Sequence, residues 1–162
     1  MKLVHSDFRR GTVKVGVENI DDLWYLSTII DRGDFVKGKT VRKMKFGSEE
    51  KQKTERKKVF LGVRVEKVEF DAVQNSLRIL GTIEEGPEDA ARGSHHSFDL
   101  GEGDSITIVK EQWLGFQKKR LEEAAKDSHA RILIVVMDRE EAYLALMKKF
   151  GYDVLAVLKG DV

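Results

Sequence analysis

The residues with the clearest capacity for chemistry are cations gathered in one stretch of the chain. Between Lys37 and Lys58 the sequence holds ten Lys or Arg but only three Glu. This leaves a local charge of +7, so with a net charge of +1 the other residues together carry −6. A basic stretch in an otherwise acidic chain is typical of contact with a polyanion at one place. The candidate RNA-binding residues are Arg42, Lys43, Lys45, Lys51, Lys53, Arg56, Lys57 and Lys58.

The contact that this stretch predicts is with phosphates rather than with bases. Each phosphate neutralised by Lys or Arg releases condensed counterions, so affinity should fall steeply with salt. Phe46 is the only aromatic residue between Lys37 and Lys58, so this stretch lacks the exposed aromatic pair on which an RRM-like or OB-like reader stacks bases. The prediction is therefore contact with the nucleic-acid backbone, independent of base sequence. The alternative is a Lys-rich hairpin that only protects a sheet edge from aggregation.

Acidic residues and histidines offer a second chemistry, metal-dependent hydrolysis of RNA. The candidates are carboxylate pairs at 21–22 and 84–85 and adjacent histidines at 95–96. Adjacent residues of a strand point to opposite faces, so the two histidines cannot share one ion. Helix-cap and surface roles explain the carboxylates more simply, and the chain has no cysteine. No catalytic residue, metal or other cofactor is predicted, and a divalent metal belongs only to the nuclease alternative.

The basic stretch is predicted to lie on a long β-hairpin. Alternating residues predict strands over 35–46 and 58–70, with the tip of the hairpin near Gly47 to Gln52. One helix followed by several short strands favours a small closed or half-open barrel. The remaining patterns predict strands over 11–16, 76–84, 97–100 and 104–110, and a helix that starts at the N-cap Asn19.

The pattern changes after Trp113, where helical periodicity predicts a helix that leaves the barrel. Residues 131–137 are then a continuous apolar run, typical of a strand buried on both faces. A helix over 139–150, with Gly151 after it, and a second buried strand over 153–158 complete a β-α-β pattern. One such unit has too little surface for a core of its own, so we expect a truncated chain.

Several stretches, in order along essentially the whole chain, resemble the archaeal Pelota family. One departure is Ser97 after His96, where the family usually has Thr. The stretches are 1–11 (MKLVHSDFRRG), 18–26 (ENIDDLWYL), 33–34 (GD), 40–43 (TVRK), 68–71 (VEFD), 77–81 (LRILG), 96–100 (HSFDL), 110–113 (KEQW) and 135–142 (VVMDREEA).

The resemblance implies a fold class that is mainly β with helices. An Sm-like β-barrel N-terminal domain is expected over residues 1–127, and a truncated α/β (βαβ) segment of a release-factor-like central domain over 128–162. It also implies ribosome rescue and mRNA surveillance, in no-go and non-stop decay. In the family the basic loop reaches toward the decoding centre and the mRNA channel.

The implied partners are the stalled ribosome with its rRNA and mRNA, an EF-Tu-like translational GTPase and an ABC-type recycling ATPase. Two alternatives stay open: a divalent-metal-dependent endoribonuclease, and a protein-interaction module for the GTPase. The sequence has no run of about 18 apolar residues, and its start, MKLVHSDFRR, is not a signal peptide. We therefore expect a cytoplasmic protein without membrane contact.

Overall fold

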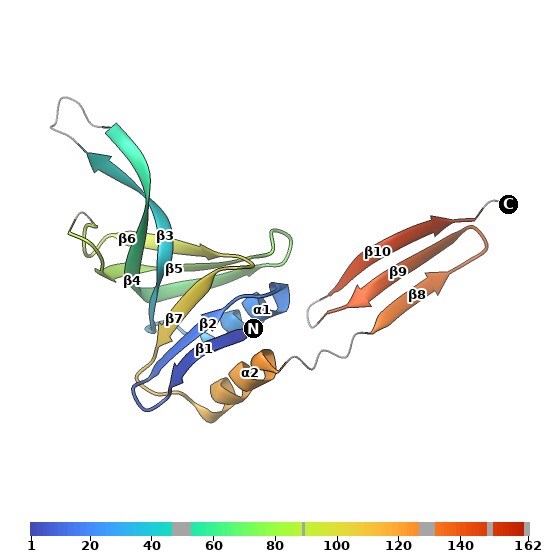
Figure 1. Ribbon diagram of the computed structural model, residues 1–162, viewed down its shortest axis with the longest axis horizontal. Coiled ribbons are helices and arrows are strands. Elements are labelled where there is room, and N and C mark those ends of the chain that lie inside the picture. Colours follow the sequence, from blue (N-terminus) through green and yellow to red (C-terminus); the bar gives the residue numbers. More distant parts are fainter. Residues whose placement is uncertain (47–52, 89, 127–131, 149–150, 161–162) are drawn as a thin grey trace. The chain divides into compact units, whose positions relative to one another are not determined.

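The computed structural model divides into two compact units, Met1–Ala125 and Lys126–Val162. It describes residues 1–46, 53–88, 90–126, 132–148 and 151–160, and for 43–46 and 53–56 it describes the backbone alone. Figure 1 draws the helices and strands of both units. In its described residues the first unit is mainly β with two helices, as predicted.

The first unit is built on one antiparallel sheet of seven strands, in the order β1-β2-β7-β3-β4-β5-β6. Strands β1 and β6 are its edges, so among the described residues the hydrogen-bonded sheet is open. The implied Sm-like barrel is therefore not confirmed, although the mainly β class is. The strands are β1 (Lys2–Asp7), β2 (Thr12–Gly16), β3 (Phe35–Phe46), β4 (Lys53–Asp71), β5 (Ser76–Glu85), β6 (His95–Leu100) and β7 (Ser105–Val109).

The core of the first unit lies on one face of the strands and against the two helices. In β5 the alternation is regular, with Leu77, Ile79 and Ile83 buried between more exposed neighbours. This is the period of two that a half-buried strand requires. Further core residues from the other strands and from the helices include Val13, Val15, Leu26, Ile29, Leu61, Val63, Ile106, Ile108 and Leu121.

Helix α1 (Ile20–Ile29) begins at the predicted cap. Asn19 Oδ1 accepts a hydrogen bond from the Asp22 backbone N–H at 3.1 Å, and the Asp22 carboxylate accepts one from the Asn19 N–H at 3.3 Å. This reciprocal pair satisfies N–H groups that the first helical turn leaves without partners. Helix α2 (Gly115–Ala125) follows Trp113, as predicted. Neither helix in the described part of the chain is long and apolar enough to cross a membrane.

Strand β1 is an element that the sequence pattern does not predict. Its first five residues are exposed, so it lacks the alternation that marks the other strands. It is held as an edge strand by antiparallel pairing with β2, from Lys2 opposite Gly16 to Asp7 opposite Thr12. Backbone hydrogen bonds, which carry no side-chain signature, therefore define this element.

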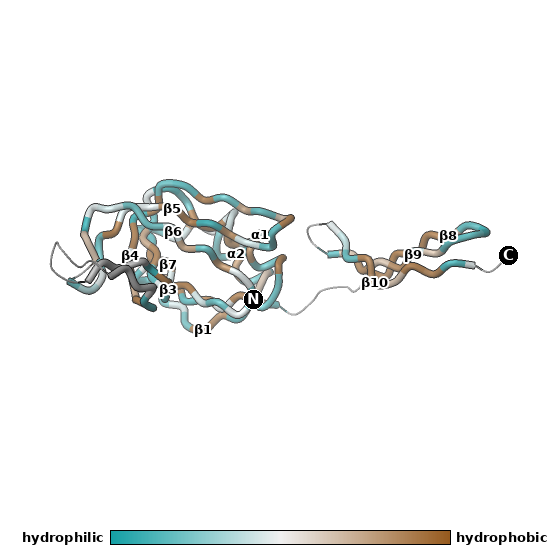
Figure 2. Tube along the Cα trace, turned by 90° about the horizontal axis from the view of Figure 1, so that it is seen from above, coloured by the Kyte–Doolittle hydropathy of each residue, from teal (hydrophilic) through white to brown (hydrophobic). Residues whose placement is uncertain are grey.

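The second unit is a three-stranded antiparallel sheet in the order β10-β9-β8, which corrects the predicted βαβ segment. Its strands are β8 (Leu133–Met137), β9 (Glu141–Met147) and β10 (Tyr152–Lys159). Strand β9 lies within 139–150, so the predicted helix there is wrong. Figure 2 shows apolar sequence along all three strands, yet most side chains of β8 are exposed in this unit rather than buried on both faces.

A tight turn explains why the second unit is antiparallel. Asp138 Oδ1 accepts hydrogen bonds from the backbone N–H groups of Glu140 and Glu141, at 2.8 and 2.7 Å. The turn brings Met137 opposite Ala142. So short a connection joins only antiparallel neighbours, because a parallel pair needs a crossover of about a dozen residues or more. Gly151 has a φ of +78° between β9 and β10, where it serves a second turn instead of ending a helix.

Candidate nucleic-acid interface

The predicted basic hairpin forms a long two-stranded ribbon, made by antiparallel pairing of β3 with β4. The register runs without a shift from Phe35 opposite Arg64 to Phe46 opposite Lys53. In Figure 1 the distal parts of both strands extend past β5 and β6. The six register pairs from Val41 to Phe46 hold seven Lys or Arg and one Glu. The ribbon therefore carries concentrated positive charge away from the core.

Seven of the eight predicted RNA-binding residues lie on these two paired strands. Lys51 and the predicted tip, 47–52, lie outside the described residues, and side chains are described only for Arg42, Lys57 and Lys58. Contact of these residues with RNA stays a prediction. In the register, Arg42 is opposite Lys57, Lys43 opposite Arg56, Lys45 opposite Thr54, Lys53 opposite Phe46 and Lys58 opposite Val41.

Arg42 differs from the exposed Lys57 and Lys58 because it is half-buried and held from outside the ribbon. Its Nη2 donates a hydrogen bond to Ser94 Oγ at 2.9 Å. Its Nη1 is buried and has no hydrogen-bond partner in the part of the chain that the structure describes. A guanidinium fixed in this way loses little side-chain entropy when it meets a ligand.

His96 lies beside Arg42 and joins β6 to β3. Its Nε2 is 3.0 Å from Thr40 Oγ1, and its ring packs edge-on against Phe98, with ring centroids 5.4 Å apart. Burial lowers the pKa of His96 and the charge of Arg42 lowers it further, while Asp99 opposes the shift. A neutral ring at pH 7 fits a structural role for His96.

The groups considered for metal chemistry have other partners within the first unit. His95 is exposed with its Nε2 3.3 Å from Glu66, so the two histidines contact different strands. Asp22 pairs with the Met1 α-ammonium at 2.8 Å in addition to capping α1. The Glu84 and Glu85 carboxylates pair with Arg64 and Lys37, at 2.7 and 2.6 Å. Within the described ranges no group of three or more His, Cys, Asp or Glu could hold a metal ion.

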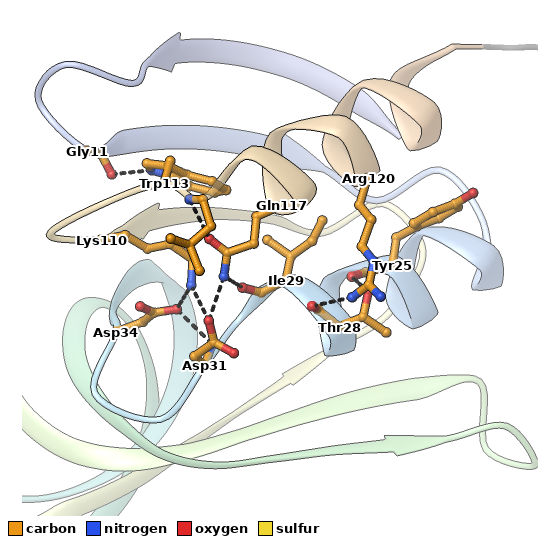
Figure 3. A network of polar contacts seen from close by, with 11 residues as sticks. Gly11, Tyr25, Thr28, Ile29, Asp31, Asp34, Lys110, Trp113, Gln117 and Arg120 are labelled. Carbon is orange, nitrogen blue, oxygen red and sulfur yellow. Dashed lines mark hydrogen bonds and ion pairs between the residues drawn. The ribbon is translucent and has the colours of Figure 1, made fainter.

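A partly buried cluster of one lysine, two aspartates and one glutamine, which no sequence pattern predicts, links α2 to the rest of the first unit (Figure 3). The Lys110 side chain is 3% exposed, and its ammonium pairs with Asp31 at 2.9 Å and with Asp34. Gln117 of α2 donates to the same Asp31 oxygen at 2.6 Å. Burial raises the pKa of Asp34, and the hydrogen bond from Lys110 counteracts that shift.

Trp113 lies beside Lys110 and adds a hydrogen bond near the start of α2. Its Nε1 donates to the Gly11 carbonyl at 2.7 Å, and the residue is 4% exposed, so Trp113 anchors this part of the core. Gly11 has a φ of +71°, and a Cβ there would lie 1.9 Å from the Lys110 carbonyl oxygen. Only glycine fits such a close approach of two backbones. Trp24, the second tryptophan of the chain, is partly buried and packs against the core.

The sheet and its ribbon define a small antiparallel β-domain that presents concentrated positive charge. Family comparison places the chain within this class: the model of the Pelota N-terminal domain matches residues 1–125. The chain is also 40% identical, over 166 aligned positions, to the pelota homolog of Thermococcus onnurineus. It therefore belongs to the Pelota family.

Two further comparisons agree with this assignment. The pelota homolog of Methanopyrus kandleri is 40% identical over 165 positions, and the alignments with both homologs cover 100% of this chain and 46% of theirs. A model of ribosome-bound archaeal Pelota and ABCE1 is 37% identical with a TM-score of 0.67, over 98% of this chain and 46% of that one. The chain thus spans about half the length of the curated relatives that it matches.

Proposed function

We propose that this chain is part of a ribosome rescue and mRNA surveillance factor, and that its β3–β4 ribbon contacts rRNA and mRNA near the decoding centre. The observation that carries the proposal is the ribbon's charge, seven cations and one anion over six register pairs, in a member of the Pelota family. The archaeal relative bound to a ribosome supports the same role. Contact with phosphates suits a factor that acts on any message, because phosphates carry no sequence information.

We further propose that residues 1–127 form an Sm-like domain and that residues 128–162 begin a release-factor-like central domain. Side-chain contacts of β3 with His96 of β6 and with Ser94, the residue before β6, support a barrel-like curl of the open sheet. They are the Thr40–His96 hydrogen bond at 3.0 Å and the Arg42–Ser94 bond at 2.9 Å. The division into two compact units at Ala125 supports the domain boundary.

The stalled ribosome is the partner that this chain should bind directly, and the role places it in the cytoplasm. For the full-length protein we propose an EF-Tu-like translational GTPase and an ABC-type recycling ATPase as further partners, from the family resemblance. These 162 residues should bind the GTPase poorly, because the family resemblance implies that GTPase binding relies largely on the central domain, and they span 46% of the length of their relative. A pull-down that retains the GTPase strongly would contradict this expectation and favour a protein-interaction module.

Co-sedimentation with archaeal ribosomes at increasing KCl tests the ribbon. Wild-type binding should weaken steeply between about 50 and about 200 mM salt, because phosphate contacts release counterions. Charge reversal at Lys43, Lys45 and Lys58 should abolish binding at low salt. Unchanged binding by this triple variant would overturn the proposed interface.

A matched triple variant keeps the change in net charge constant. Lys14 on β2, Lys119 on α2 and Lys126 are exposed and lie off the ribbon. Their reversal to Glu removes the same total charge, so ribosome binding should fall only slightly. Equal losses in the two triple variants would mean that overall charge, and not the ribbon, governs the interaction.

A further inference from the structure

One aromatic side chain stands exposed where the ribbon leaves the core. Val36, Leu61 and Val63 are buried, so they mark the inner face of β3 and β4. Because side chains alternate along a strand, Lys39 and Phe60 belong to the opposite, outer face. Phe60 is 54% exposed there, whereas a core residue such as Phe98 is 1% exposed.

The outer face gathers two apolar side chains and two lysines into one patch. Lys39 is opposite Phe60 in the register, and Val41 is opposite Lys58. Directly paired residues of antiparallel strands share a face with Cβ atoms about 5 Å apart, and the next pair along that face is within reach of long side chains. Val41 is 53% exposed, and both lysines are exposed. We call Lys39, Val41, Lys58 and Phe60 the outer patch.

Nearer the core, the same face carries the Phe35 ring and two cations that already have partners within the fold. Lys37 Nζ and the Arg64 guanidinium each lie 5.2 Å from the centroid of the Phe35 ring. These two cations are also paired with Glu85 at 2.6 Å and Glu84 at 2.7 Å. Phe35 therefore has both its cationic neighbours and their counter-ions within the fold.

Phe60 differs from Phe35, because the lysines beside it are not paired with carboxylates among the described residues. Neither Lys39 nor Lys58 forms an ion pair with any residue that the structure describes, and no described cation stacks on the Phe60 ring. An exposed ring between two unneutralised lysines combines the two features that bind single-stranded nucleic acid. The ring stacks on a base, and the ammonium groups hold the flanking phosphates.

We propose that the outer patch binds an unpaired base of single-stranded RNA by stacking on Phe60, with Lys39 and Lys58 on the adjoining phosphates. This inference rests on the proposed function and gives the ribbon a second mode of contact. Phe60 lies two residues beyond the basic stretch, so the count of aromatic residues within that stretch missed it. Stacking is tolerant of sequence, because every base has a flat face, so it remains compatible with action on any message.

Fluorescence anisotropy with two labelled RNAs of about ten nucleotides, a length within the usual site sizes, separates stacking from phosphate contact. One is oligouridylate, and the other has the same backbone but abasic riboses. Phe60→Ala should weaken binding to oligouridylate about tenfold, within the range measured for one base stacked on an aromatic ring. The same change should leave binding to the abasic RNA unaltered.

The chain offers a matched control in Phe116 on α2. Its side chain is 52% exposed, and the Arg120 guanidinium lies 5.3 Å from its ring centroid. Phe116→Ala should change binding to neither RNA. Equal affinity of the wild type for the two RNAs, or equal effects of the two Phe→Ala changes, would overturn the inference.

A Phe60→Trp variant gives a second readout if Phe60→Ala does not fold. Its indole emission, corrected for Trp24 and Trp113 with the wild-type protein, should be quenched by oligouridylate and not by abasic RNA. No quenching would reject stacking. A chain that binds ribosomes through the ribbon without Phe60-dependent binding would refute this inference alone. Phe60-dependent stacking without ribosome binding would instead refute the proposed function.

Discussion

Lys110 and the basic residues of the β3–β4 ribbon, all in the first unit, have opposite environments. Lys110 is 3% exposed and pairs with Asp31 and Asp34, so its charge is neutralised inside the fold. The distal part of the ribbon, from the Val41–Lys58 pair to the Phe46–Lys53 pair, holds seven cations and one Glu. The carboxylates of its own strands therefore cannot neutralise its charge. Nearby carboxylates, and not residue type, therefore decide whether a lysine stabilises the fold or is available to a partner.

Lys110→Met removes the buried lysine and should have the largest effect on stability. The change leaves Asp34, whose side chain is 12% exposed, without its cation, and breaking a buried pair from one side typically costs about 3 kcal/mol or more. Urea denaturation should show a loss of about 3 kcal/mol in the free energy of unfolding. A second change, Asp34→Asn, should recover part of it. If the Lys110→Met variant is as stable as the wild type, the pairing of Lys110 with Asp34 does not stabilise the fold.

The stability loss caused by Lys110→Met should also depend on pH. Burial raises the pKa of Asp34, so folding penalises its carboxylate at neutral pH, and Lys110 counteracts the penalty. Without Lys110 the loss should be full above the folded-state pKa. It should shrink as pH falls toward the unfolded value of about 3.9, where both states bind the proton.

The Met1 α-ammonium extends the comparison to a second buried cation. It is fully buried, 2.8 Å from Asp22 Oδ1, and donates to the Ala124 carbonyl at 3.1 Å. Asp22→Asn should lower the free energy of unfolding by about 2 kcal/mol, since it leaves a buried charge poorly compensated. The control is Glu18→Gln, because Glu18 is 57% exposed and 3.1 Å from the same ammonium. Thermal unfolding should show a change of no more than about 0.5 kcal/mol for this control.

His96 is half-buried, and its titration should change the free energy of unfolding less than the loss of Lys110 does. Its pKa is lowered by burial and by Arg42, so the folded state binds the proton less readily than the unfolded state. Its contribution to stability is present above the unfolded value of about 6.5 and is lost as pH falls through the lowered folded value. His96→Gln should remove the part of the stability change between pH 7 and about 5 that this ring causes. An identical pH profile in the variant would assign that change to other groups.

The smallest expected effect on stability belongs to Lys58. Lys58→Gln should change the free energy of unfolding by less than about 0.5 kcal/mol, because the side chain is exposed. The same change should reduce the slope of log affinity for RNA against log salt by about one. Lys119→Gln, an exposed lysine on α2, is the control for both measurements. A stability loss comparable to that of Lys110→Met would erase the distinction between the two groups.

Most elements of the first unit are predictable because their patterns report local physics. Alternation marks β3 and β5, and the capping box at Asn19 marks the start of α1. The second unit is harder, because EAYLALM at 141–147 has the composition of a helix. Pairing of β9 with both β8 and β10 overrides that preference, and the short Asp138 turn makes the pairing antiparallel.

The candidate interface is only partly predictable for the same reason. The charge of the 37–58 stretch is visible as a local count, whereas the outer patch joins Lys39 and Phe60 across two strands. Their proximity depends on register, which one-dimensional counting does not supply. Arg42 is likewise a surface cation by sequence, and only its contact with Ser94 shows that it is held.

The amino-acid sequence alone determined that this protein is mainly β, that one hairpin carries a dense positive charge, and that it resembles the Pelota family. Those properties follow from composition, period and order, which need no knowledge of contacts. Which cations are neutralised depends on the folded arrangement of the chain. Lys110 meets Asp31 across 79 positions of sequence, while Lys39 and Lys58 meet no carboxylate among the described residues. The physical reason is that electrostatic energy depends on distance in space, and folding sets that distance.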